Sequence, residues 1–385
     1  MNSQHLSDLF SEYKEETLSG RYITSDLIQP LIDQYSKILD VEQVGMSEND
    51  LPIYLIKLGT GSKTLVYWSQ MHGNESTTTK AVFDFLKLLT NHKADFVAKI
   101  LEECTLYIIP ILNPDGAKAY TRLNYHNIDL NRDAQDLSQK ESLVLDKVLR
   151  QNKPDFAFNL HGQRTIFSAG LVNKPATVSF LSPAAAQNRN ITESRKKAMD
   201  VIVYMNKVLQ KFIPGQVGRY DDGFNLNCVG DTLSSRNIPV ILFEAGHYPQ
   251  DYEREEARKF IFYSLISSAY YIASETMTGN LYDEYFEIPE NEKLFYDIII
   301  RDVILEEKNV DIAIQYEEIL EENVIKFLPK VVKIDNLKKF YGHREINGKK
   351  RSILNENVRN QIVPEAILLN FRLDTELFST ELVKS

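Results

Sequence analysis

Apolar and polar positions along the chain alternate between two repeating patterns. Short apolar runs bounded by glycine and polar clusters predict strands at residues 52–58, 63–68, 105–112, 155–160 and 239–243. Between them, apolar residues recur at helical spacing and predict helices at residues 81–89, 141–149, 195–211 and 252–273. Strands that alternate with helices of this length predict an α/β fold, with a mixed, mostly parallel central sheet flanked by helices.

The two ends of the chain depart from this alternation. Residues 1–45 are predicted to form a helical N-terminal extension of a domain that reaches residue 279. After Gly279 the helical periodicity stops, and strand patterns separated by acidic turns take over. Residues 280–385 are therefore predicted to form a small, acidic, strand-rich C-terminal domain of unknown role. His343, within it, fits a solvated or capping side chain better than a ligand.

Composition narrows the range of partners. The chain has 385 residues, with 44 Lys and Arg against 54 Asp and Glu, so its formal net charge is −10. Such acidity disfavours nucleic acid or an anionic membrane as a partner. The two cysteines, Cys104 and Cys228, are too few for a disulfide scaffold or a cysteine-rich zinc module. The N-terminus has no signal-peptide pattern and no run is long enough to span a membrane, so we expect a cytoplasmic protein.

Three residues near predicted strand ends have the chemistry of a metal site. His72 follows the strand at 63–68, Glu75 comes three residues later at a helix start, and His161 ends the strand at 155–160. Taken separately, His72 could belong to a polar turn, Glu75 could be a charge at the start of a helix, and His161 could be a histidine of the core. Together they would make a His2Glu set, and three protein ligands leave the fourth zinc position open for water or substrate.

Other polar segments also follow predicted strands. Asn113-Pro114-Asp115-Gly116 is by itself a turn signal. Arginines and asparagines follow between residues 122 and 132, and a guanidinium matches a carboxylate bidentately, although a solvated loop would look the same. Glu244 directly follows four apolar residues, which is a costly position for a carboxylate unless it acts as a general base or pairs with an arginine.

The ordered combination resembles the zinc carboxypeptidase family, the M14 metallocarboxypeptidases, and within it a bacterial-type subgroup. The resemblance rests on HxxE at 72–75, NPDG at 113–116, RxN at 122–124, DLNR at 129–132 and the strand-ending His161 and Glu244. It implies one Zn2+ per chain, bound by His72, Glu75 and His161. It further implies Glu244 as general base, Arg122 polarising the scissile carbonyl, Asn131 and Arg132 holding the substrate carboxylate, and Asp129 orienting His72.

Some positions depart from the pancreatic-type pattern. Asn74 stands where those enzymes often have arginine, and Gly162 and Gln163 follow His161 in place of Ser-Tyr. For the tyrosine that covers the substrate, Tyr220 is the first candidate and Tyr248 the second. His247 lies near the predicted site but is not expected to be a ligand.

The resemblance implies a hydrolase that cleaves an amide next to a free C-terminal carboxylate, so its partner would be a peptide or acylated amino acid. Two related enzymes remain as alternatives: an N-acyl amino acid deacylase of the aspartoacylase or succinylglutamate desuccinylase type, and a cell-wall peptide amidase. NPDG together with RxN favours the peptidase. A zinc- or peptide-binding protein without turnover is a further alternative. The sequence indicates neither the oligomeric state nor the preferred C-terminal residue.

Overall fold

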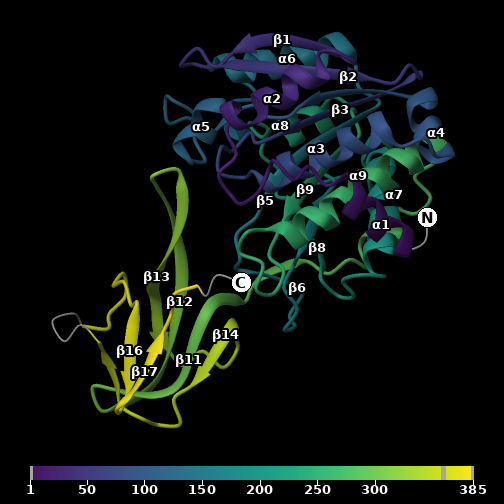
Figure 1. Ribbon diagram of the computed structural model, residues 1–385. Helices are drawn as coiled ribbons and strands as arrows, with labels where there is room; N and C mark the ends of the chain where they lie inside the picture. The colour runs from purple at the N-terminus through teal and green to yellow at the C-terminus, as the bar shows by residue number, and fades with distance from the viewer. Residues whose placement is uncertain (1–2, 357–360, 383–385) are drawn as a thin grey trace. The chain divides into compact units, whose positions relative to one another are not determined.

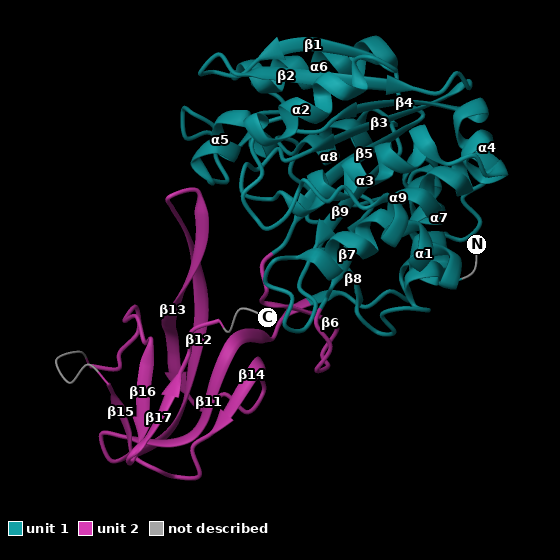
Figure 2. Ribbon diagram, viewed as in Figure 1, with its two compact units in different colours: residues 1–163, 176–291 teal, residues 164–175, 292–385 magenta. Residues whose placement is uncertain are grey.

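The computed structural model describes residues 3–356 and 361–382, and the chain divides into two compact units (Figure 2). Unit 1 comprises residues 1–163 and 176–291, and unit 2 comprises residues 164–175 and 292–385. The chain therefore enters unit 2 twice. The first of these two segments, residues 164–175, is short and separates the strand that contains His161 from a later strand of the same sheet.

Unit 1 is built around an eight-stranded sheet in the order β1-β2-β4-β3-β5-β9-β7-β8 (Figure 1). Its strands are β1 Asp40–Met46, β2 Pro52–Leu58, β3 Lys63–Ser69, β4 Cys104–Ile109, β5 Phe156–Gly162, β7 Val178–Leu181, β8 Val217–Arg219 and β9 Val240–Ala245. The pairs β3–β4, β3–β5, β5–β9 and β7–β8 are parallel, and the pairs β1–β2, β2–β4 and β7–β9 are antiparallel. The predicted mixed, mostly parallel sheet is thus confirmed.

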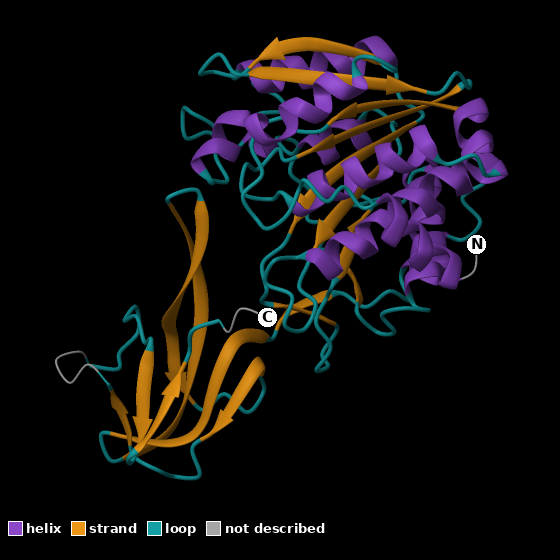
Figure 3. Ribbon diagram, viewed as in Figure 1, coloured by secondary structure: helices purple, strands orange, loops and turns teal. Residues whose placement is uncertain are grey.

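Helices cover both faces of this sheet (Figure 3). They are α1 Ser3–Tyr13, α2 Ser25–Tyr35, α3 Thr77–Asn91, α4 Asp95–Glu103, α5 Pro114–Ala119, α6 Lys140–Asn152, α7 Glu193–Leu209, α8 Val229–Ser235, α9 Glu255–Ser274 and α10 Tyr282–Tyr285. Leu65 and Tyr67 pack in the core that contains α3, α7 and α9, whereas Val66 and Trp68 pack in the core that contains α6 and α8. Among the described residues, no helix is both long and apolar enough to cross a bilayer.

The differences between prediction and structure lie in short or polar elements. The predicted helical extension ends before residue 45, because β1 begins at Asp40 and forms the edge of the sheet. The residues of β1, DVEQVGM, are exposed or only partly buried. Their sequence therefore lacks the apolar run by which the other strands were recognised. Strands β7 and β8 have four and three residues, too few for a period to be detected.

Unit 2 is strand-rich, as expected. Its four-stranded sheet has the order β13-β12-β11-β14, a three-stranded sheet has the order β15-β16-β17, and β6 pairs with β10. The bounds are β6 Phe167–Ala169, β10 Asn291–Lys293, β11 Phe295–Leu305, β12 Lys308–Glu321, β13 Val324–Asp335, β14 Tyr341–Asn347, β15 Ile353–Asn355, β16 Asn370–Leu373 and β17 Glu376–Ser379. The ring of His343 stacks on Phe295, and its Nε2 lies 2.7 Å from the carbonyl oxygen of Thr165. The domain boundary at 279/280 remains a prediction.

A buried ion pair joins two helices on one side of the sheet of unit 1. Asp84 of α3 receives two hydrogen bonds from Arg258 of α9, at 2.6 and 2.7 Å, and both side chains are fully buried. Arg258 also donates to the carbonyl oxygens of Leu18 and Glu15. One guanidinium therefore ties the segment after α1 to both helices.

We expect Asp84→Asn to lower the free energy of unfolding by about 3–5 kcal/mol, since removing one partner leaves Arg258 buried without its closest counter-charge. Urea unfolding followed by circular dichroism measures the change. The control is Glu103→Gln, which removes the exposed pair between Glu103 and Lys99. This variant should unfold like the parent protein. Equal stability of the two variants would contradict the importance of the buried pair.

Candidate metal centre

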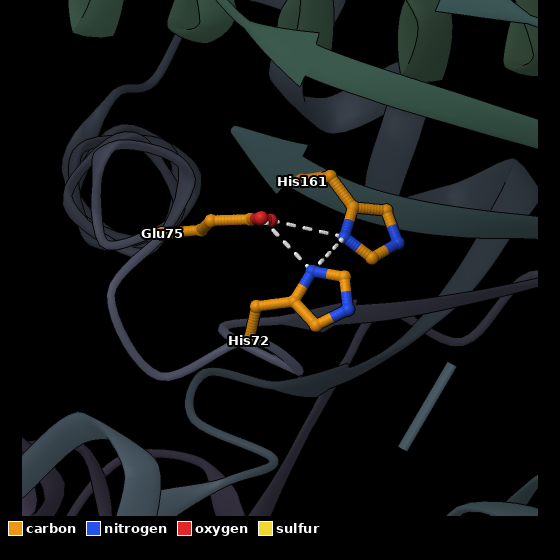
Figure 4. Close-up of side chains that lie close together, drawn as sticks. All are labelled: His72, Glu75 and His161. Carbon is orange, nitrogen blue, oxygen red and sulfur yellow. Dashed lines mark hydrogen bonds and ion pairs between the residues drawn. The ribbon is translucent and has the colours of Figure 1, made fainter. Parts of the chain in front are cut away.

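Three side chains converge at the carboxyl ends of β3 and β5, two central strands of the sheet of unit 1. His72 lies in the loop after β3, Glu75 lies just before α3, and His161 lies in β5. The Nδ1 atom of His72 is 2.9 Å from Glu75 Oε1, the Nδ1 atom of His161 is 3.1 Å from Glu75 Oε2, and the two Nδ1 atoms are 3.1 Å apart. Figure 4 shows both rings turning a nitrogen toward the carboxylate.

The donor set and its spacing fit a zinc ion. Zn2+ binds imidazole nitrogen and carboxylate oxygen at about 2.0–2.2 Å, so tetrahedral geometry places its ligand atoms about 3.3 Å from one another. The three closest separations here are only slightly shorter. Within residues 3–356 and 361–382, this is the one group of three or more His, Cys, Asp or Glu side chains arranged to hold a metal.

Asp129 fixes the orientation of His72. Its Oδ1 atom lies 3.0 Å from His72 Nε2 and accepts the backbone N–H of Asn131 at 2.9 Å. Burial by itself would lower the pKa of His72, but the charge of Glu75 and the hydrogen bonds to Asp129 and Glu75 raise it overall. Burial raises the pKa of Asp129, and the hydrogen bond to His72 and the charges of His72 and Arg122 outweigh it, so that carboxyl stays ionised. A carboxylate behind a metal-binding imidazole is a common arrangement in zinc sites.

The NPDG segment supports the loop that carries His72. Asn113 caps α5 by accepting the N–H of Gly116 at 2.8 Å, and its amide donates to the carbonyl oxygen of Met71 at 3.1 Å. Gly73 packs so closely on this turn that a Cβ atom there would lie 1.9 Å from the carbonyl carbon of Gly116. The motif thus has a structural function: it holds the backbone on either side of His72 in place.

Glu244 stands beside His161 because strands β5 and β9 pair these two residues in parallel register. Directly paired residues of neighbouring strands point their side chains to the same face of a sheet. Burial and the negative charge of Glu75 raise the pKa of Glu244 well above its ordinary value, and Arg122 opposes this shift. Its Oε2 atom is buried and has no hydrogen-bond partner among the described residues. A carboxyl with these properties can accept and return a proton at the site.

Arg122 borders the metal cluster from the solvent side. Its Nε donates to Asp129 Oδ2 at 3.1 Å, and its terminal nitrogen lies 3.3 Å from Glu75 Oε1. The side chain is 44% exposed, so its guanidinium can also reach a molecule in the site. Asn124, the other half of the RxN motif, is buried and donates to Gln139, which makes it a loop-bracing residue.

Asn131 and Arg132 lie in the short 3-10 helix Leu130–Arg132 that follows Asp129. The side-chain oxygen of Asn131 accepts the N–H of Val229, the first residue of α8, at 3.1 Å. Because that oxygen is engaged, the amide NH2 is the part of Asn131 that can face a substrate. Arg132 is exposed and donates to the carbonyl oxygen of Asn131 at 2.8 Å.

The structure separates the tyrosine candidates. Tyr220 follows β8, and its pKa is raised to about 12 by burial and by the charges of Glu244 and Glu75, so it lies within electrostatic reach of the site. Tyr248 instead packs against the core, with its ring 5.9 Å from that of Phe260. His247 is buried with its ring 4.7 Å from Tyr252 and is not part of the metal cluster.

One polar network beside Glu244 was not predicted from the sequence. Gln163 donates to Ser179 at 3.0 Å and accepts from Asn291 at 2.8 Å, and Ser179 donates to Asn291 at 3.0 Å. Ser179 is the residue of β7 that pairs with Glu244. These side chains come from three distant segments without a motif, so no sequence pattern could have linked them.

Part of this chain is similar in sequence to known carboxypeptidases. Residues 24–196 match the family model described as zinc carboxypeptidase. Carboxypeptidase SOL1 of Arabidopsis thaliana is 28% identical over 167 residues, which are 38% of this chain and 34% of that protein. A γ-D-glutamyl-L-diamino acid endopeptidase of Lysinibacillus sphaericus is 28% identical over 126 residues, which are 31% of this chain and 30% of that protein. The matched segment of this chain thus covers about a third of the length of each of these relatives.

Solved structures share the fold. The metallo-carboxypeptidase from Burkholderia cenocepacia superposes with a TM-score of 0.52 at 17% sequence identity, covering 64% of this chain and 68% of its own. The eight-stranded sheet flanked by helices is therefore the carboxypeptidase fold.

We expect Gly73→Ala to destabilise the protein by several kcal/mol, because the added methyl group would meet the backbone of Gly116, which cannot move without displacing α5. Thermal unfolding measures the change. Gly223→Ala is the matched control, since its Cβ would meet only the end of the Asp221 side chain, at 3.1 Å. A melting temperature for Gly73→Ala equal to that of the control would show that this contact does not constrain the loop.

Proposed function

We propose that this chain, whose residues 24–196 belong to the zinc carboxypeptidase family, hydrolyses the amide bond next to a free C-terminal carboxylate of a peptide. The observation that carries the proposal is the His72–Glu75–His161 cluster with Glu244 standing beside His161 on the next strand. A zinc-binding set next to a buried carboxyl of raised pKa is the arrangement that metal-assisted hydrolysis requires.

In this proposal His72, Glu75 and His161 hold one Zn2+, which would lower the pKa of a bound water and polarise the scissile carbonyl. Glu244 takes a proton from the attacking water. Glu244 then delivers this proton to the nitrogen of the leaving amine. Asp129 keeps the His72 ring in the orientation that presents Nδ1 to the site.

The remaining polar groups position the substrate. Arg122 lies 3.3 Å from Glu75, at the edge of the cluster, where its guanidinium can stabilise the negative charge that develops on the carbonyl oxygen. Arg132 and the side-chain NH2 of Asn131 supply donors for the terminal carboxylate of the substrate. Tyr220, close enough to feel the charges of Glu244 and Glu75, covers the bound peptide.

A second candidate substrate is a cell-wall peptide. The similarity to the γ-D-glutamyl-L-diamino acid endopeptidase favours it, since such a substrate also contains an amide bond that a zinc hydrolase can cleave. A screen of ordinary peptides, γ-D-glutamyl-diamino acid peptides and N-acyl amino acids decides between a carboxypeptidase, a cell-wall peptidase and a deacylase.

We expect Glu244→Gln to retain zinc and to lose at least about 100-fold in kcat, because the amide cannot transfer the proton. His161→Ala should lose the metal as well as activity. Metal analysis by mass spectrometry and hydrolysis of a peptide reporter measure both properties. His247→Ala, a buried histidine outside the cluster, is the control and should keep its zinc. Near-normal turnover by Glu244→Gln would overturn the assignment of the base.

We expect the enzyme to require a free carboxyl terminus. A peptide with a C-terminal amide should be cleaved at least about tenfold more slowly than the same peptide with a carboxylate, because a charge-assisted pair with Arg132 is lost. Arg132→Ala should raise KM for the carboxylate peptide and abolish this preference, while kcat changes less. Equal hydrolysis of both peptides by the parent protein would favour an endopeptidase.

A further inference from the structure

A short segment between the first two helices contacts the loop that carries two of the candidate metal ligands. We call this segment, residues 15–24, the strap, and we call residues 70–76, which include His72 and Glu75, the ligand loop. The match to the zinc carboxypeptidase family begins at residue 24, so the strap lies almost wholly before it. The function of the strap therefore has to be inferred from its own contacts.

Two polar side chains at the ends of the ligand loop donate hydrogen bonds to the strap. Gln70, at the first position of the loop, donates through Nε2 to the carbonyl oxygen of Ile23 at 2.8 Å. Ser76, at the last position, donates through Oγ to the carbonyl oxygen of Arg21. Gln70 and Ser76 are buried, each with at most 1% of its surface exposed. The strap thus binds the loop on both sides of the candidate ligands.

The amide of Gln70 joins three segments at once. Besides its bond to the strap, its Nε2 donates to the carbonyl oxygen of Gly73 at 2.7 Å, and its Oε1 accepts the hydroxyl of Thr79 at 2.8 Å. Gly73 directly follows His72, and Thr79 lies in α3, four residues after Glu75. One buried side chain therefore links the strap to the segments that carry both candidate ligands of this loop.

The backbone of Gln70 adds a second reason to regard this amide as a support. Its φ angle is +50°, in the left-handed region that residues other than glycine rarely adopt. Glycine would adopt this conformation without strain, but it would supply no side-chain hydrogen bonds. A residue stays in such a conformation only where its surroundings hold it there. The bonds of the Gln70 amide to the strap, the loop and α3 provide that support.

The strap is itself held in place by contacts that do not involve the ligand loop. Near its start, Arg258 donates to the carbonyl oxygens of Glu15 and Leu18. Near its end, the hydroxyl of Tyr22 donates to a backbone carbonyl oxygen of α5 at 2.7 Å. The side chains of Leu18 and Ile23 are buried in the core beneath α3 and α9. The strap can therefore act as a fixed support for the loop.

We propose that the strap holds the ligand loop in its metal-binding conformation before the ion arrives, with Gln70 and Ser76 as the positioning residues. This inference rests on the proposed function, since it takes His72 and Glu75 as zinc ligands. Ligand atoms that are already held in place lose less conformational freedom when the metal binds, so the ion is bound more tightly and is released more slowly. Without these two bonds, the loop would keep its bond to Asn113 but would lose its support on the strap side.

The test compares the release of zinc from the parent protein with its release from Gln70→Asn and Ser76→Ala. Asparagine accepts the left-handed backbone, but its amide is one methylene shorter, and alanine removes the serine hydroxyl. We expect a chromogenic chelator to remove zinc at least about fivefold faster from each variant, because losing a contact behind a metal ligand weakens metal binding by this factor or more. Release at the parent rate from both variants would overturn the proposal.

Tyr13→Phe is the matched control. It also removes one hydroxyl that joins the N-terminal part of the chain to α3, but at the other end of that helix, where Tyr13 lies 2.9 Å from Nδ1 of His92. This variant should release zinc at the parent rate. Equally fast release from the control and from Ser76→Ala would show that general loosening of the N-terminal part, and not the strap contact, controls the metal, which would also overturn the proposal.

Amide hydrogen exchange of the zinc-free protein separates this inference from the proposed function. Residues 70–76 should exchange at least about fivefold faster in Gln70→Asn and Ser76→Ala than in the parent and the control, while the rest of unit 1 exchanges as before. If the protein hydrolyses no peptide but shows this local change, the support of the loop by the strap stands although the reaction is different. If the protein hydrolyses peptides and neither exchange nor zinc release changes, the function stands and the role of the strap is wrong.

Discussion

The parallel register between β5 and β9 is the constraint on which the candidate site depends. It pairs His161 with Glu244, so the candidate metal ligand and the carboxyl that we propose as the base lie on neighbouring strands without any loop having to position them. The parallel pairing of β3 with β5 then brings the loop that carries His72 and Glu75 to the same edge. Ligands of open α/β sheets lie at the carboxyl ends of such strands because consecutive loops meet there.

Two carboxyl groups of this site have pKa values shifted in opposite directions, and the difference comes from their neighbours. Burial raises the pKa of both Glu75 and Glu244. For Glu75, the charges of and hydrogen bonds from His72 and His161 outweigh burial, and its pKa falls far below the ordinary value. For Glu244, burial and then the negative charge of Glu75 raise the pKa, and Arg122 opposes them only in part. One carboxyl is thereby suited to hold a cation and the other to carry a proton.

The sequence allowed the convergence of the candidate metal ligands to be predicted better than the contacts that hold them in place. His72, Glu75, His161 and Glu244 each follow or end a strong apolar run, so strand ends could be recognised and their polar residues assigned to one edge. The bracing roles of Asn113 and Asn124 depend on contacts with residues elsewhere in the chain, as with Met71 and Gln139. A local pattern cannot contain such contacts. The short strands β7 and β8 were missed for the same reason, since partners far away in sequence stabilise them.

The boundaries of unit 1 explain how its site tolerates an inserted excursion of the chain. The chain leaves after Gln163 and returns at Ala176, and the side chain of Gln163 donates to the carbonyl oxygen of Ala176 at 2.8 Å. It leaves for good after Asn291, whose amide donates to Gln163. The two points where the chain leaves unit 1 and the point where it returns are therefore joined by hydrogen bonds of one buried glutamine, two residues beyond His161. Because these bonds lie within unit 1, residues of unit 1 hold the end of strand β5, which carries His161.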